Sequence, residues 1–108
     1  MQIKHSEYVP VFKALADETR LKIVEMLSCG EMCACDLLEP FNITQPTLSY
    51  HMKILTECGL VEGKKEGSWM RYHINMDKIK MIQLLCNRIE FDQDTCICKD
   101  KKEGCLCE

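Results

Sequence analysis

The sequence contains no apolar run that approaches the roughly 20 residues of a membrane-spanning helix. Its first seven residues also lack the apolar core of a secretory signal. Nine cysteines would suit a secreted disulfide scaffold, but the count is odd and the signal is missing. We therefore expect a cytoplasmic protein that has no membrane partner and keeps its thiols reduced.

An excess of positive charge is missing too, because the formal net charge is -3 at pH 7. This balance does not exclude a nucleic-acid-binding protein, since a DNA-reading surface needs local rather than total positive charge. Basic residues do gather in the middle of the chain, at Lys53, Lys64, Lys65 and Arg71, whereas acidic residues gather toward its end. The net charge alone therefore neither supports nor excludes DNA binding.

The machinery of common enzymes is also absent, because the sequence has no nucleotide-binding loop, no general base and no acidic pair. A chain of 108 residues is long enough for one domain with a modest core. We expect residues 1–91 to form that domain. Residues 92–108 are polar apart from Ile97, Leu106 and four cysteines, which predicts a flexible, cysteine-rich C-terminal tail.

Apolar residues recur at helical spacing in the N-terminal part of the chain. They predict a first helix over residues 7–16, then a second helix that follows the N-cap Asp17 and stops at Gly30. A short third helix fits residues 33–39. The apolar face of the second helix is expected to consist of Leu21, Val24 and Leu27, with Ile23 beside them.

A fourth helix is expected to begin at the N-cap Thr44 and to stop at Gly59. Its buried stripe would consist of Leu48, Met52 and Leu55. Because a short link joins it to the third helix, the two form a helix-turn-helix. Two strands, 60–62 and 69–74, follow around a lysine-rich loop, and their alternating side chains predict a half-buried hairpin. A hairpin in this place is a wing.

A last helix is predicted over residues 77–91, with apolar side chains on two stripes. A terminal helix with apolar side chains on two faces needs a packing partner for each face. We therefore expect it to form a dimer interface together with the first helix. The expected fold class is mainly α with a β-hairpin wing (α+β), a dimeric winged helix-turn-helix. Residues 1–91 would then be its DNA-binding and dimerisation domain.

Residues 12–75 resemble the ArsR-type (ArsR/SmtB) family of winged-helix metalloregulators. The resemblance rests on Leu-Ala-Asp-Glu-Thr-Arg-Leu at 15–21, Met-Cys-Ala-Cys-Asp-Leu at 32–37, Thr-Gln-Pro-Thr-Leu-Ser-Tyr-His-Met at 44–52 and Glu-Cys-Gly-Leu-Val at 57–61. It implies a transcriptional repressor, not an enzyme, whose metal-free homodimer occupies double-stranded operator DNA and is released by metal. The Cys-x-Cys-Asp-Leu element implies the branch that senses As(III) and Sb(III), and the alternative is a related branch that senses Cd(II) and Pb(II).

Cys33 and Cys35 are the strongest candidates for metal ligands. Two thiols two residues apart form a poor disulfide but bind soft metal ions well. In an intact helix they would point about 200° apart at roughly 100° per residue, so we expect metal binding to unwind the start of the third helix. The plainer alternative is that both are small packing residues.

The third ligand is open, because Leu38 stands where the arsenite branch often has another cysteine. The candidates are the four tail cysteines and one earlier residue: Cys96, Cys98, Cys105, Cys107 and Cys29. The tail thiols could instead form a separate thiolate site or only scavenge metal. Cys58 and Cys86 are expected to be packing residues. The last helix contains no histidine, which disfavours the zinc, nickel or cobalt sensors of the family.

The recognition helix offers polar side chains off its apolar stripe. These candidates for DNA contact are Gln45, Thr47, Ser49, Tyr50 and Lys53. His51 lies nearer the edge of the stripe, so packing and DNA contact are equally open for it. In the wing, Lys64, Lys65 and Arg71 suit contact with the DNA backbone or the minor groove.

Two functions of other classes compete with a repressor. A thiol-redox sensor would use the cysteines, but Cys-x-Cys lacks the spacing and the βαβ context of thioredoxin-like motifs. A metal-buffering protein would explain the tail but would leave the helix-turn-helix and the wing unused. Operator binding measured with and without arsenite would separate these functions.

Overall fold

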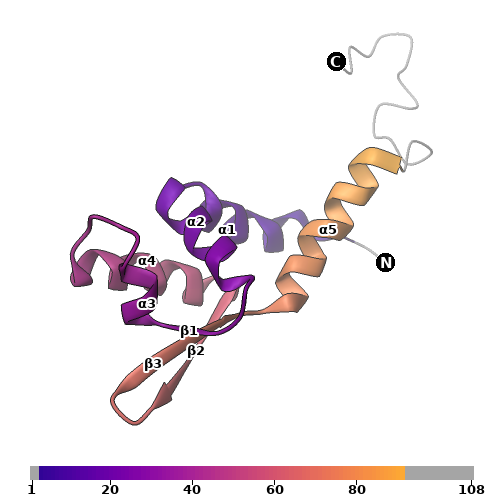
Figure 1. Cartoon of the computed structure of the whole chain (residues 1–108). Coiled ribbons are helices and arrows are strands. Elements are labelled where there is room, and N and C mark those ends of the chain that lie inside the picture. Colours follow the sequence, from indigo (N-terminus) through magenta and orange to yellow (C-terminus); the bar gives the residue numbers. More distant parts are fainter. Residues whose placement is uncertain (1–2, 92–108) are drawn as a thin grey trace, which may run out of the picture.

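The computed structural model describes residues 3–91, and the expected tail lies outside them. The elements in chain order are α1 (His5–Leu15), α2 (Glu18–Leu27), β1 (Met32–Cys33), α3 (Ala34–Leu38), α4 (Gln45–Glu57), β2 (Val61–Glu66), β3 (Trp69–Ile74) and α5 (Met76–Phe91). Figure 1 shows α1 to α4 gathered into one cluster, from which the β2–β3 hairpin and α5 extend in different directions. The expectation of a mainly α fold with a β-hairpin wing is confirmed.

Local capping explains where α2 and α4 begin. The Asp17 carboxylate accepts a hydrogen bond from the Arg20 backbone N–H at 3.0 Å, and the Thr44 hydroxyl accepts one from the Thr47 N–H at 3.3 Å. The chain leaves α4 at Gly59, whose φ of 84° lies in the left-handed region that favours glycine. Both predicted N-caps are therefore confirmed.

The hydrophobic core lies among α1, α2, α3, α4 and the base of the wing. Its largest fully buried side chains are Val11, Ile23, Leu37, Leu48, Leu55, Leu60 and Val61. The predicted stripe of α4 is confirmed, since Leu48, Met52 and Leu55 are 2%, 2% and 0% exposed. Burial of each such side chain contributes about 1.5–3 kcal/mol, which holds α4 firmly against α1 and α2.

The predicted apolar face of α2 is wrong at Leu21, whose exposed fraction is 54%. The buried residues of this helix are Ile23 and Leu27, one turn apart on the same stripe. Leu21 lies two residues from Ile23, which places it about 200° around the helix and therefore toward solvent. Val24 is half-buried at the edge of the buried stripe.

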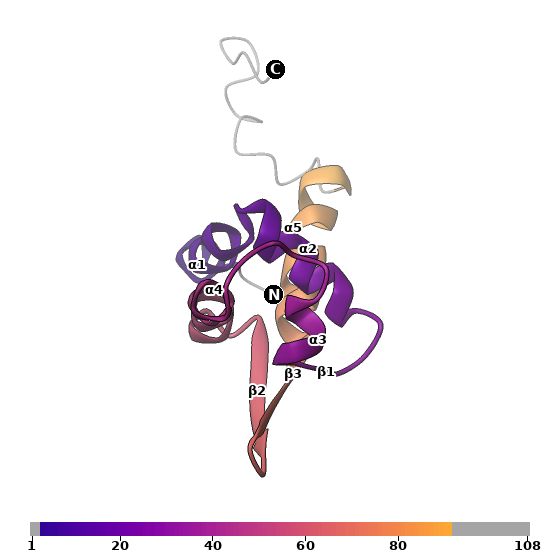
Figure 2. The same ribbon diagram turned by 60° about the vertical axis from the view of Figure 1, so that its left-hand side comes forward.

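The wing is a longer hairpin than the sequence suggested. β2 and β3 pair from Val61 opposite Ile74 to Glu66 opposite Trp69, and a turn containing Gly67 closes the hairpin. Figure 2 shows it projecting beyond the helices. The expected half-buried alternation is wrong for its outer half, because the outer residues of β3 are all exposed and only its inner three are half-buried.

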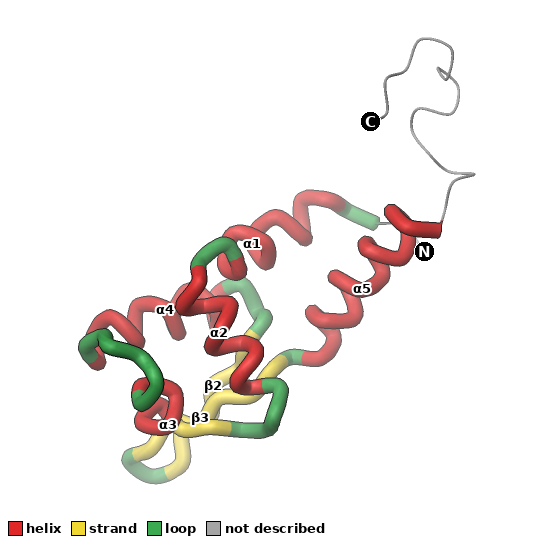
Figure 3. The backbone as a smooth tube through the Cα atoms, turned by 45° about the horizontal axis from the view of Figure 1, so that its top comes forward, coloured by secondary structure: helices red, strands yellow, loops and turns green. Residues whose placement is uncertain are grey.

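The helices α1 and α5 contact each other, and Figure 3 shows both away from the wing turn. Within the single chain, residues 76–90 of α5 include no buried side chain. Ile89 of α5 is 76% exposed, and Val9 and Phe12 of α1 are 47% and 41% exposed. Much of the apolar surface of α1 and α5 is thus exposed to solvent in the single chain. Within residues 3–91, no helix combines the length and the apolar character that crossing a membrane would require.

Candidate metal centre and nucleic-acid interface

The thiols of Cys33 and Cys35 lie together where β1 meets α3. Cys33 ends β1 and is the N-cap of α3, with an extended backbone at φ -83° and ψ 164°. The two Sγ atoms are 2.6 Å apart. The expectation that a metal must unwind the third helix is therefore wrong, because Cys33 stands outside that helix and its extended backbone turns its thiol toward Cys35.

The pair can hold one ion without a change of backbone. Two thiolates on a tetrahedral ion with metal–sulfur bonds of about 2.3 Å stand about 3.8 Å apart. Rotation of one side chain opens the pair to that separation, and neither thiol is confined by the core, since Cys33 is half-buried and Cys35 is exposed. This exposure argues against the alternative in which both are packing residues.

Asp36 lies beside the thiols. The Cys33 thiol donates a hydrogen bond to Asp36 Oδ2 at 3.2 Å, and the three residues offer donor atoms within 4.8 Å of one another. Among the residues that the structure describes, no other group of three Cys, His, Asp or Glu side chains is close enough to hold a metal ion. Two sulfurs beside one exposed carboxylate suit a soft, thiol-preferring ion better than a hard one.

The pKa of the Cys35 thiol is raised above its ordinary value. The largest cause is the hydrogen bond with Cys33, followed by desolvation and by the negative charges that Cys33 and Asp36 can carry. Cys35 is therefore a protonated thiol at neutral pH. An ion that binds both sulfurs must displace the proton of Cys35.

The short strand β1 ties the thiol pair to the wing. Met32 pairs with Tyr72, and Cys33 pairs with Arg71, in an antiparallel ladder with β3. The following helix α3 contacts both β3 and α4. The sequence did not reveal β1, because a strand of two residues has no periodicity to detect. The candidate ligands thus lie between the two elements that are expected to touch DNA.

The candidates for the third thiolate differ in what the structure says about them. Cys29 is exposed and does not belong to the group formed by Cys33, Cys35 and Asp36. Cys96, Cys98, Cys105 and Cys107 lie outside the described residues. Of the two expected packing cysteines, Cys58 is half-buried and donates to the Leu55 carbonyl at 3.3 Å, whereas Cys86 is exposed in the single chain.

The candidates for DNA contact on α4 share its outer face. Gln45, Thr47, Ser49, Tyr50 and Lys53 are all exposed, opposite the buried stripe that packs on α1 and α2. Tyr50 is 61% exposed. A helix held in this way can present its outer side chains to a DNA groove.

A polar network fastens α4 to the preceding helices through His51. Arg20 Nη1 lies 3.1 Å from His51 Nδ1, and Arg20 Nε donates to the Ala14 carbonyl at 2.6 Å. His51 is only 9% exposed, which favours packing over DNA contact for this residue. We therefore leave His51 out of the DNA-contacting set. Sequence reasoning missed Arg20, whose place in the 15–21 motif was the available signal.

The same network lowers the pKa of the Asp17 carboxyl. The largest cause is the hydrogen bond from the Arg20 backbone N–H, which desolvation opposes and the charges of Arg20 and His51 reinforce. Asp17 Oδ2 lies 3.9 Å from His51 Nδ1. Asp17 is thus an ionised cap throughout the neutral pH range.

Two basic side chains of the wing, those of Lys64 and Arg71, lie close to an acidic one. Lys64 and Arg71 are cross-strand partners, and both approach Glu66, with Arg71 Nε 3.0 Å from Oε1 and Lys64 Nζ 3.9 Å from Oε2. Lys65 is exposed on the same strand. Exposed ion pairs contribute little stability, so a DNA phosphate can take the place of the Glu66 carboxylate at small cost.

The chain is similar in sequence to known regulatory proteins. The family described as bacterial regulatory protein, arsR family, matches residues 17–63. An arsenical resistance operon repressor of Staphylococcus aureus is 42% identical over 102 residues, which cover 94% of this chain and 98% of the relative.

Solved structures extend the similarity to the fold. An ArsR-like transcriptional regulator from Rhodococcus sp. RHA1 gives a TM-score of 0.73 at 28% identity, over 93% of this chain and 94% of that one. The homodimeric winged helix-turn-helix DNA-binding domain of a possible ArsR-family regulator from Mycobacterium bovis gives 0.65 at 27% identity, over 78% and 82% of the two chains.

Proposed function

Because the chain belongs to the ArsR family of bacterial regulatory proteins, we propose that it is a homodimeric repressor that leaves its operator when As(III) or Sb(III) binds Cys33 and Cys35. Members of this family are transcriptional regulators that bind DNA, not enzymes. The observation that carries the choice of inducer is the thiol pair of half-buried Cys33 and exposed Cys35, whose Sγ atoms lie 2.6 Å apart in a segment continuous with the helix-turn-helix. We place the protein in the cytoplasm, where operator DNA lies.

The outer face of α4 and the wing would make the contacts with DNA. Gln45 and Tyr50 can reach base edges, whereas Thr47, Ser49 and Lys53 suit phosphate oxygens. Lys64, Lys65 and Arg71 would hold the backbone or the minor groove beside the wing. The exposure of all eight side chains supports this assignment.

A second copy of the chain would cover the apolar surface of α1 and α5. Val9, Phe12 and Ile89 are exposed there, and the Mycobacterium bovis domain of similar fold is homodimeric. A twofold dimer presents two α4 helices to half-sites about 34 Å apart, one turn of DNA. The operator should therefore be a palindrome.

The inducer would bind through three thiolates, two of which are Cys33 and Cys35. Trivalent arsenic and antimony prefer soft sulfur ligands, and three of them complete a pyramid. The third thiolate would come from residues 92–108, from among Cys96, Cys98, Cys105 and Cys107. The separate position of Cys29 supports this choice over Cys29.

Release from DNA would follow from the position of the thiol pair. An ion at Cys33 acts on β3 through the β1 ladder, and an ion at Cys35 acts on α4 through α3. A coupling free energy of about 1–3 kcal/mol would lower operator affinity by roughly 5- to 150-fold. Small shifts of α4 and the wing are enough to misalign two half-sites.

Titration of the protein–operator complex with inducer tests the proposal. In reducing buffer, micromolar arsenite or antimonite should dissociate a complex of the full chain with a palindromic duplex in a gel-shift assay. Persistence of the complex at saturating arsenite, together with release by Cd(II) or Pb(II), would instead support the sensor of those metals. Release by an oxidant alone, reversed by a reductant, would indicate a redox sensor.

A further inference from the structure

Contacts among three side chains connect α2 to the outer face of α4. Arg20 donates from Nε to the Ala14 carbonyl at 2.6 Å, and its Nη1 lies 3.1 Å from Nδ1 of His51. The His51 ring meets the Tyr50 ring edge-on, with centroids 5.6 Å apart and 62° between the planes. One imidazole ring therefore joins Arg20, which is half-buried, to Tyr50, which is 61% exposed.

The contact with Arg20 defines the hydrogen-bonding state of His51. A guanidinium has only donors, so Nδ1 of His51 must accept, and the proton of the neutral ring lies on Nε2. Asp17 Oδ2 is 3.9 Å from the same nitrogen, too far for a second strong hydrogen bond. The side chains that α1, α3 and β2 bury beside α4 are apolar, and include Val11, Leu37 and Val61. In these surroundings the hydrogen bond from Arg20 is stronger than it would be in water.

Arginine suits this position because of its shape. The guanidinium is planar, and its N–H groups point in fixed directions. Because the Ala14 carbonyl near the end of α1 holds Nε, the direction of Nη1 is restricted as well, and Nη1 points at His51. The orientation of the His51 ring is thus set from outside α4.

We propose that Arg20 is a positioning residue for operator recognition, which holds the His51 ring so that this ring supports Tyr50 at the angle needed for base contact. The inference rests on the proposed function, because it requires an operator whose bases Tyr50 contacts. It extends that function to two side chains that do not themselves touch DNA. Most of the Tyr50 surface is exposed, so the edge contact with His51 restrains where the Tyr50 hydroxyl lies.

Loss of this restraint should weaken specific binding and spare non-specific binding. Non-specific affinity comes from contacts of lysine and arginine with phosphates, which the orientation of Tyr50 does not alter. A base contact discriminates between sequences only when its side chain reaches the base edge with the right geometry. The ratio of the affinity for the operator to the affinity for a scrambled duplex is therefore the quantity that reports on Arg20.

Fluorescence anisotropy of the full chain, with a labelled operator and a scrambled duplex of the same composition, measures this ratio. Arg20→Lys keeps the positive charge but cannot reproduce the simultaneous contacts with Ala14 and His51. The affinity for the operator should fall by roughly fivefold or more, because a base contact is misplaced. The affinity for the scrambled duplex should change less than twofold.

A double-mutant cycle separates positioning from folding. In a Tyr50→Ala background, Arg20→Lys should lower the affinity for the operator less than twofold, because the ring that Arg20 supports is gone. Ser49→Ala is the matched background, since Ser49 is exposed on the same helix but lies outside the ring contact. In that background Arg20→Lys should keep its full effect.

His51→Asn provides a second variant if Arg20→Lys does not fold. Asparagine keeps an acceptor for Arg20 but has no ring to support Tyr50, so its loss of operator affinity should also vanish in the Tyr50→Ala background. Equal losses in the two backgrounds, or equal losses for the two duplexes, would overturn the positioning role. If the original protein bound both duplexes equally, the proposed function itself would be wrong.

Discussion

Cys33 lies directly opposite Arg71 in the pairing of β1 with β3. One residue is a proposed inducer ligand and the other a wing cation proposed to contact DNA, and only a backbone ladder separates them. Arg71 Nε also lies 3.0 Å from Glu66 Oε1, so the same residue of β3 pairs with the candidate ligand through its backbone and with an acidic residue through its side chain. In the proposed function, this adjacency would leave a single backbone ladder between an inducer ligand and a residue that contacts DNA.

Replacement of either thiol should separate sensing from DNA binding. Cys33→Ser and Cys35→Ser each remove one metal–sulfur bond, but neither side chain belongs to the proposed DNA contacts. Operator affinity should stay within about twofold, and the concentration of arsenite needed for release should rise at least tenfold. Gel-shift titration measures both quantities.

The control for these variants is Cys58→Ser. The Cys58 thiol is half-buried and donates a hydrogen bond to the Leu55 carbonyl, away from the thiol pair. Its arsenite response should match that of the original protein. Loss of operator binding in a correctly folded Cys33→Ser variant would show instead that this residue serves the structure.

Truncation after Phe91 should weaken the response to arsenite while preserving the dimer and operator binding. The change removes four thiols and none of the buried core residues. X-ray absorption should count about two sulfur neighbours around arsenic in the shortened chain and three in the full chain. If the sulfur count and the release curve were unchanged, the third sulfur ligand of arsenic would have to be a thiol from solution or from elsewhere in the chain.

Removal of a core side chain from the recognition helix should be costly. Leu55 is completely buried, so Leu55→Ala should lower the free energy of unfolding by about 2–5 kcal/mol. Leu21→Ala is the same substitution at a residue that is 54% exposed, and should cost less than about 1 kcal/mol. Urea denaturation at a fixed protein concentration measures both, and equal losses would contradict the assignment of the buried face of α2.

Asp17 should contribute a pH-dependent part of the stability. Its folded-state pKa lies below the unfolded value of about 3.9, so its contribution is fully present well above pH 4 and is lost as pH falls through the folded-state pKa. Asp17→Asn keeps a good N-cap but removes the charge. The variant should be less stable than the original protein at pH 7, and the difference should shrink below about pH 4. A difference that stays constant with pH would assign the effect to capping alone.

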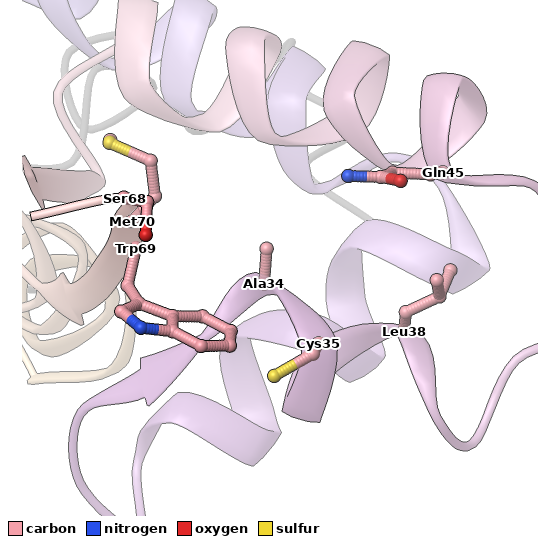
Figure 4. A pocket seen from close by; sticks show the side chains of 7 residues that line it. All are labelled: Ala34, Cys35, Leu38, Gln45, Ser68, Trp69 and Met70. Carbon is pink, nitrogen blue, oxygen red and sulfur yellow. The ribbon is translucent and has the colours of Figure 1, made fainter.

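Capping and periodicity made α4 readable from the sequence, because Thr44 and the stripe of Leu48, Met52 and Leu55 act over a few neighbouring residues. The face of α2 was less certain, since Leu21 and Ile23 are both apolar and only packing decides which is buried. The pairing of β1 with β3, and the cavity of about 290 Å³ that Cys35 and Trp69 both line (Figure 4), join residues distant in sequence. No local pattern encodes such contacts.

The extended backbone at Cys33 also bears on how fast the protein can respond. Since the two sulfurs already face each other, capture of an inducer does not have to wait for a helical turn to open. The observed binding rate should therefore rise in proportion to inducer concentration and should not level off at the rate of a conformational step. Diffusion and the exchange of oxygen for sulfur on the metalloid, rather than the folding dynamics of α3, would then set the delay between exposure and transcription.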